Sequence, residues 1–166
     1  PPAAPLPSVT AMRSGLPLPV LAGLALLAVP RAVLHDLKII HEGTVVNALF
    51  VAVPLLIWIV VVVAARVPRP FPALLVVGAF YGVGLAVVHQ VFWDVDVQLG
   101  GNLAERLPPA AEAGIIRTFA ASSSLFTGLL TGAVTGLVAW AIAALIRRRP
   151  TDDPTGRSRR PGAPTT

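Results

Sequence analysis

Apolar residues gather in four long runs along the chain, and short polar segments separate them. The runs cover residues 16–34, 44–66, 71–93 and 115–146. About 20 apolar residues in helical conformation are enough to cross the hydrocarbon core of a membrane, which is about 30 Å thick. Helices are favoured in lipid because they satisfy their own backbone hydrogen bonds. The pattern therefore predicts an all-α fold, an integral membrane bundle of about four transmembrane helices with antiparallel, up-down packing.

The first apolar run is the weakest of the four, because Pro17, Pro19, Pro30 and Arg31 interrupt it. A basic residue followed by such a run is also typical of a cleaved signal peptide. No small-residue cleavage motif follows this run, so we expect a retained helix and keep cleavage as the alternative.

Outside the transmembrane domain expected over residues 16–146, the two ends of the chain lack hydrophobic periodicity. Residues 1–15 are rich in proline and residues 147–166 in arginine and proline, so both are expected to be disordered tails.

Residues 31–42 have a different pattern, because Arg31, His35, Lys38 and Glu42 follow one another at helical spacing. Apolar residues occupy the opposite side of the same helical wheel. This segment is expected to be an amphipathic helix that lies in the membrane interface or extends the first span.

The distribution of basic residues predicts the orientation of the bundle. Nine of the thirteen Lys and Arg residues lie in the two tails and in the turn at residues 66–70. Four spans place these three segments on one side of the membrane, and basic residues are retained on the cytoplasmic side. Both termini are therefore expected in the cytoplasm, and residues 31–43 and 94–114 outside.

Composition narrows the class of protein further. Hydrophobic residues make up 55% of the chain and charged residues 13%, with a mean hydropathy of +0.77. A soluble helical protein is the alternative, but it would need polar helix faces that the long runs lack. The chain has no cysteine, which excludes disulfides, zinc-thiolate sites, iron-sulfur clusters and thiol catalysis. The abundance of Arg, Ala, Val, Gly and Pro points to a bacterial plasma membrane protein.

Two apolar runs carry small residues at intervals of four. Such a glycine-zipper pattern lets helix backbones approach closely, which matters in lipid because little hydrophobic drive acts between helices. We expect the two faces to pack together within the chain, with a homo-oligomer seam or a pore lining as alternatives. The small residues are Gly78, Gly82 and Ala86 in the third run, and Ser124, Gly128, Gly132 and Gly136 in the fourth.

His89 and Arg117 lie on or close to these packing faces near their outer ends and are the candidates for buried polar groups. An ionisable side chain inside a membrane span indicates function. The simpler alternative is structural: Arg117 pairs with Asp94 or Asp96, and neutral His89 bonds to a serine such as Ser122 or Ser123.

Every histidine is expected on the outer side, together with several acids. Imidazole and carboxylate groups are ligands for divalent transition metals, and two histidines could instead be the axial ligands of haem b. The spacing matches no established metal motif. The candidate set is His35, Asp36, His41, Glu42, His89, Asp94 and Asp96.

His35 with Asp36, or His89 with Asp94, could also form a proton relay, because histidine titrates near neutrality. The chain is short and has no internal repeat, so a transporter would have to assemble from several copies.

No catalytic motif is present, since Ser122, Ser123 and Ser124 lack the G-x-S-x-G context of a serine nucleophile. The leading hypothesis is a multi-pass, non-enzymatic accessory or assembly subunit, alone as a homo-oligomer or within a larger membrane complex. The alternatives are an extracytoplasmic metal or haem protein and a small oligomeric proton-coupled transporter. The positive charge of the tails is expected to meet anionic lipid rather than nucleic acid.

Overall fold

The computed structural model describes residues 15–92 and 108–147, and the described chain is all helical with no strand. Four helical stretches are long and apolar enough to cross a membrane. The first stretch contains two helices with a break between them, and each of the others is a single helix. The helices are α1 (Leu18–Leu26), α2 (Val29–Asp36), α3 (Val45–Ala64), α4 (Pro70–Val91) and α6 (Pro109–Arg147).

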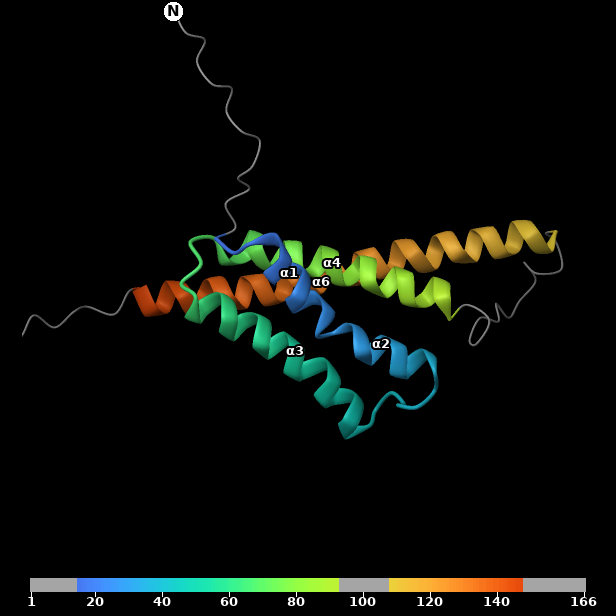
Figure 1. Ribbon diagram of the computed structural model, residues 1–166, viewed down its shortest axis with the longest axis horizontal. Helices are drawn as coiled ribbons and strands as arrows, with labels where there is room; N and C mark the ends of the chain where they lie inside the picture. The colour runs from blue at the N-terminus through green and yellow to red at the C-terminus, as the bar shows by residue number, and fades with distance from the viewer. Residues whose placement is uncertain (1–14, 93–107, 148–166) are drawn as a thin grey trace, which may run out of the picture.

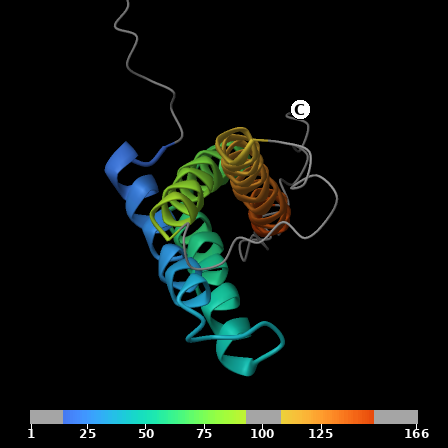
Figure 2. The same ribbon diagram turned by 90° about the vertical axis from the view of Figure 1, so that its right-hand side faces the viewer.

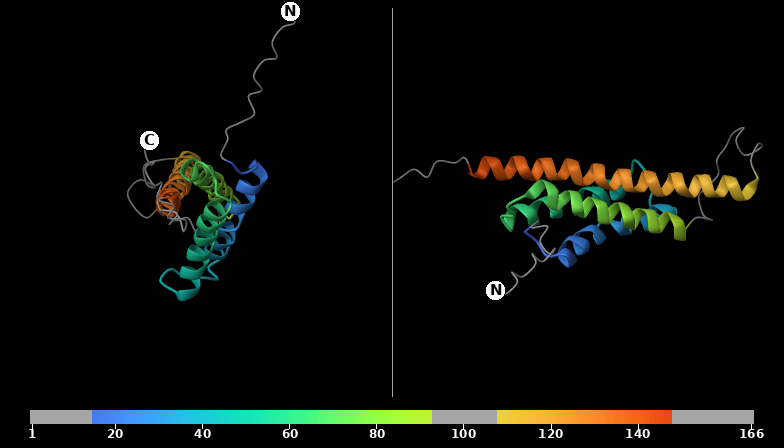
Figure 3. Two further views of the ribbon diagram at one scale, coloured as in Figure 1. Left: turned by 90° about the vertical axis from the view of Figure 1, so that its left-hand side faces the viewer. Right: turned by 90° about the horizontal axis from the view of Figure 1, so that it is seen from above.

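Helices α4 and α6 form the long axis of the molecule and run antiparallel, side by side (Figure 1). Helix α6 extends beyond α4 at both ends, as the view from above shows (Figure 3). Helices α1, α2 and α3 cover the pair from one side, which leaves much of α6 uncovered (Figure 2). Helix α4 contacts all the other helices and is therefore the centre of the bundle.

Proline determines the break in the first stretch. Pro30 is the second residue of α2, where its missing N–H costs nothing, but its ring prevents α1 from continuing regularly through this point. The N–H groups of Leu27 and Ala28 donate to carbonyls three residues back instead of four, which makes a tighter turn than an α-helix. The indole N–H of Trp58 donates to the Leu24 carbonyl at 2.7 Å, so a side chain of α3 joins the hydrogen bonds at the break.

Helix α2 ends at Asp36, so the amphipathic helix expected over residues 31–42 stops six residues early. Lys38 adopts a left-handed conformation with φ of 58°. Its N–H bonds to the His35 carbonyl, and the N–H of Ile39 bonds to the Leu34 carbonyl. This pair of bonds is a Schellman motif, which closes a helix end and turns the chain away.

The core lies where α1, α3 and α4 meet. Its largest fully buried side chains are Trp58, Leu21, Leu74, Val62 and Val77. Trp58 packs edge-on against Tyr81, with ring centroids 5.8 Å apart. The core therefore connects the broken first stretch to α3 and α4, close to the polar residues described next.

Candidate functional site: a buried carboxylate among histidines

The most unusual side chain in the bundle is the Asp36 carboxylate. The residue is only 5% exposed, although a carboxylate is among the groups that are most costly to bury without a partner. The Nδ1 atom of His89 lies 2.8 Å from Asp36 Oδ2. This hydrogen bond joins the last residue of α2 to the last turn of α4, across 53 residues of sequence.

His35 lies near the other oxygen of the same carboxylate. Its Nδ1 atom lies 3.7 Å from Asp36 Oδ1, and its Nε2 atom lies 3.6 Å from Glu42 Oε1. The Glu42 side chain is 78% exposed, whereas that of Asp36 is 8% exposed. The four groups therefore form a series that leads from an exposed carboxylate to a buried carboxylate and its imidazole partner. In order, its members are Glu42, His35, Asp36 and His89. We call this the carboxylate–imidazole series.

The series opens on a cavity of about 150 Å³. Three helices contribute polar side chains to its wall: Arg31, His35 and Asp36 from α2, Tyr81 and His89 from α4, and Ser123, Ser124 and Thr127 from α6. Arg31 and His35 are four residues apart, as are Ser123 and Thr127, and Tyr81 and His89 are eight residues apart, so the members of each pair lie on one helix face. The cavity therefore lies where the polar faces of α2, α4 and α6 meet.

Arg31 supplies positive charge to this cavity. Its Nε atom donates to Asn47 Oδ1 at 3.0 Å, and its guanidinium lies beside the Tyr81 hydroxyl. Asn47 is held at the start of α3, where its backbone N–H donates to the Thr44 hydroxyl. The arginine thus links α2 to α3 and α4 and places a fixed charge near Asp36.

The hydroxyls of α6 are bonded to their own helix. Ser123 and Ser124 both donate to the Ala120 carbonyl, at 3.0 and 2.7 Å. Their oxygens keep lone pairs that can accept a further hydrogen bond. The cavity therefore contains acceptors from α6 opposite the imidazoles of α2 and α4.

The structure brings together three of the seven residues of the metal candidate set around one point: His35, Asp36 and His89. Glu42 is next to His35, while His41 is exposed and does not line the cavity. Asp94 and Asp96 lie outside the described residues. Within residues 15–92 and 108–147, no group of three or more His, Asp or Glu side chains has a geometry suited to a metal ion.

The two candidates for buried polar groups have different surroundings. His89 is half-buried and bonds to Asp36, rather than to Ser122 or Ser123 as the structural alternative supposed. Arg117 is exposed on α6, and its backbone carbonyl accepts a hydrogen bond from the Gln90 side chain.

The small-residue faces of α4 and α6 lie against each other. A Cβ added at Gly78 would collide with the Gly128 carbonyl and would lie 2.7 Å from Gly132 Cα. One added at Gly82 would lie 3.0 Å from the Ser124 carbonyl, and one at Gly136 would lie 3.0 Å from the Phe71 carbonyl. Ala86 is half-buried on α4. Close backbone contact along this seam holds α6 against α4 beside the cavity.

Sequence reasoning overlooked Tyr81 as a site residue and the contribution of Thr127. A signal was present, because Tyr81, Leu85 and His89 follow one another at four-residue intervals and all line the cavity.

Comparisons with family models, curated proteins and solved structures find no match to this chain.

Proposed function

We propose that this chain is a multi-pass protein of the bacterial plasma membrane and that Asp36 and His89 bind and release a proton as protons cross the bundle. The observation that carries the proposal is the 2.8 Å contact between the buried Asp36 carboxylate and the His89 imidazole. Ionisable groups buried within a membrane bundle are costly and are characteristic of proton relays and transport pathways.

Exposed apolar surface supports insertion into lipid. Helices α3 and α6 expose many large apolar side chains, among them Leu49, Leu56, Val60, Phe126, Leu130 and Leu137. A water-soluble monomer rarely exposes contiguous apolar area on this scale. Lipid tails would cover these faces at no cost.

The ends of the bundle differ in charge, which supports the proposed orientation. Arg66, Arg69 and Arg147 lie at the end where α3 and α6 finish and α4 begins. The carboxylate–imidazole series and Glu112 lie at the opposite end, where Arg31, Lys38 and Arg117 balance the acids of the described chain. Because nine of the thirteen basic residues belong to the tails and the turn at the first end, and basic residues are retained in the cytoplasm, the series would face outward and both termini inward.

The carboxylate–imidazole series gives the proton a route. Glu42 can exchange protons with water, and His35 lies between Glu42 and Asp36, at 3.6 and 3.7 Å. These separations exceed a hydrogen bond, so each transfer needs a bridging water or a small rotation of the imidazole. At Asp36 the proton can be shared with His89, whose second ring nitrogen is then available to pass on or accept a proton.

Hydroxyl groups continue from the cavity toward the basic end. Thr127, Thr131 and Thr135 lie at four-residue intervals on α6, and the hydroxyls of Thr131 and Thr135 each donate to a carbonyl four residues back, at 2.8 Å. At about 1.5 Å per residue this row spans roughly 12 Å. Thr127 is exposed in a single copy of the chain, so we propose that several copies assemble to enclose the pathway.

Proton flux into vesicles tests this proposal. The purified protein is reconstituted with a pH-sensitive dye inside, and a potassium diffusion potential drives protons inward. We expect acidification with the parent chain and a rate equal to that of protein-free vesicles with Asp36→Asn, which keeps the size and removes the proton-binding group. Glu112→Gln removes a carboxylate at the same end but outside the series, and is expected to leave the rate unchanged.

A parent chain that acidifies vesicles no faster than empty ones would contradict the transport proposal. The non-enzymatic accessory or assembly subunit would then be the better explanation of the bundle. Equal flux in the parent and in Asp36→Asn would instead show that protons take a path that avoids this site.

A further inference from the structure

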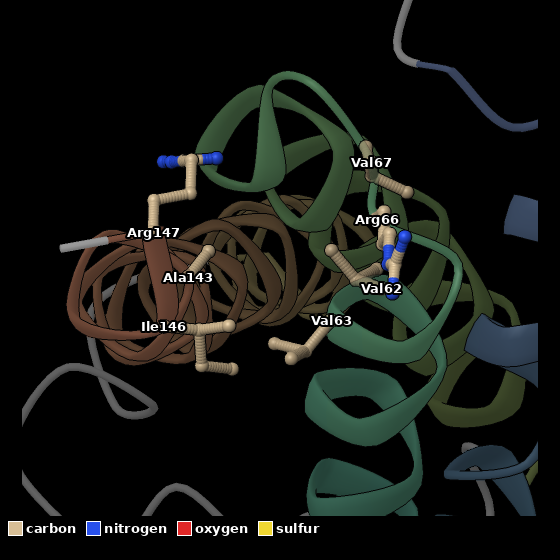
Figure 4. A pocket seen from close by; sticks show the side chains of 7 residues that line it. All are labelled: Val62, Val63, Arg66, Val67, Ala143, Ile146 and Arg147. Carbon is tan, nitrogen blue, oxygen red and sulfur yellow. The ribbon is translucent and has the colours of Figure 1, made fainter. Parts of the chain in front are cut away.

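A second cavity, of about 360 Å³, lies at the basic end of the bundle, far from the carboxylate–imidazole series. It is formed where the C-terminal ends of α3 and α6 approach each other (Figure 4). We call it the α3–α6 groove. Arg66 and Arg147 lie on either side of it, and its apolar lining is Val62, Val63, Val67, Ala143 and Ile146.

Arg66 is held in a conformation that normally favours glycine. Its φ is 50°, and its N–H bonds to the Val63 carbonyl while the N–H of Val67 bonds to the Val62 carbonyl. These bonds form a Schellman motif, in which the left-handed position is most often glycine. A side chain at that position costs free energy, and strained residues of this kind cluster at ligand sites.

Neither guanidinium at the groove has a side-chain hydrogen bond or ion pair within the described part of the chain. Both residues are exposed. A groove with an apolar floor and two free cations at its edge is complementary to a molecule with a hydrocarbon chain and an anionic head. An apolar cavity of about 150 Å³ can already hold a benzene ring, so the α3–α6 groove has room for several carbons of an acyl chain.

We infer that the α3–α6 groove binds one anionic phospholipid of the cytoplasmic leaflet. The phosphate lies between Arg66 and Arg147, and an acyl chain packs against Val63 and Ile146. The inference rests on the membrane insertion proposed above but is independent of proton transfer. The bound lipid would then be part of the packing between α3 and α6.

Native mass spectrometry of the detergent-purified protein tests the inference, with phosphatidylglycerol and phosphatidylcholine of identical acyl chains as probes. We expect phosphatidylglycerol to bind more tightly. Arg66→Gly and Arg147→Gln should each weaken its binding about fivefold, the effect of removing one basic residue near an anionic head group. Arg69→Gln, which removes a charge at the same end but outside the groove, should leave the affinity unchanged.

Arg66→Gly separates binding from folding, because glycine suits the left-handed position. The variant should unfold at the same or higher detergent stress than the parent while losing lipid. Ala143→Phe fills the groove without altering charge and should weaken both lipids. These two variants test the head-group and acyl-chain contacts separately.

Equal affinity for the two lipids, or parent-like binding of phosphatidylglycerol by Arg66→Gly, would overturn the inference. So would full competition by glycerol 3-phosphate, because a free phosphate ester would then be the ligand. Asp36→Asn should bind lipid as the parent does, so a failure of the proton proposal leaves this result intact. A chain that does not float with vesicles would instead refute the membrane insertion beneath both proposals.

Discussion

Trp58 has two structural roles at the break between α1 and α2. Its indole N–H donates to the Leu24 carbonyl at 2.7 Å, and its ring packs edge-on against Tyr81. Trp58→Phe removes the donor and the five-membered ring of the indole, while a six-membered aromatic ring remains at the site. We expect a loss of about 1–3 kcal/mol in the free energy of unfolding, because the hydrogen bond is lost and a small cavity is left in the core.

Equilibrium unfolding in mixed micelles with increasing SDS measures this loss. Trp140→Phe is the matched control, because Trp140 is 54% exposed on α6 and its loss should change little. Equal effects of the two substitutions would show that the Leu24 bond adds nothing to stability.

At the site, the sequence predicts which residues are candidates but not which of them contact one another. His35, Asp36, Glu42 and His89 are recognisable as candidates because ionisable groups are rare in apolar segments. The sequence does not show which groups these side chains contact, because it pairs His89 with Asp94 or with a serine rather than with Asp36. The contact between His89 and Asp36 depends on α2 ending at Asp36. That helix end depends on a left-handed conformation at Lys38, which the sequence pattern does not indicate.

At the scale of helices, two glycines of α6 differ in their surroundings, because one lies in the seam with α4 and the other lies outside it. A Cβ at Gly128 would collide with the backbone of Gly78 and Gly82, whereas one at Gly114 would meet nothing within 4 Å. Gly128→Ala should therefore destabilise the protein by about 1–3 kcal/mol, since neither backbone can yield easily. Gly114→Ala should stabilise it by up to about 1 kcal/mol, because alanine is the better helix former.

Unfolding in SDS again provides the measurement, and the sign of the difference is the test. Stabilisation by Gly128→Ala would mean that the two helices do not approach each other as closely as described. Destabilisation by Gly114→Ala would mean that its open position is filled in the folded protein.

The helices show why periodicity predicts some elements better than others. Helices α3 and α4 follow from long apolar runs without charged residues, although α3 contains Pro54, and prolines mark the start of α4. The division of the first stretch into α1 and α2 depends on how the carbonyls around Pro30 find new partners. One of those partners, Trp58, is 34 residues from Leu24 in sequence, so no local pattern contains it.

For the whole molecule, the main consequence is a polarity along the bundle axis. Helix α6 has 39 residues, so at about 1.5 Å per residue it is roughly 58 Å long, well beyond a hydrocarbon core of about 30 Å. In the proposed membrane orientation, part of α6 therefore projects beyond the hydrocarbon core. Its C-terminal end borders the α3–α6 groove, and its N-terminal turns extend past the C-terminal end of α4 (Figure 3).

Cysteine labelling tests this polarity, because the native chain has no cysteine and every introduced one is unique. Glu42→Cys and Arg69→Cys place exposed thiols at opposite ends of the bundle. With both termini in the cytoplasm, a membrane-impermeant maleimide should label Glu42→Cys in intact cells and Arg69→Cys only after permeabilisation. The reverse pattern would invert the molecule, placing the carboxylate–imidazole series inside and the α3–α6 groove against the outer leaflet. Labelling of both thiols in intact cells would show that the bundle does not span the membrane.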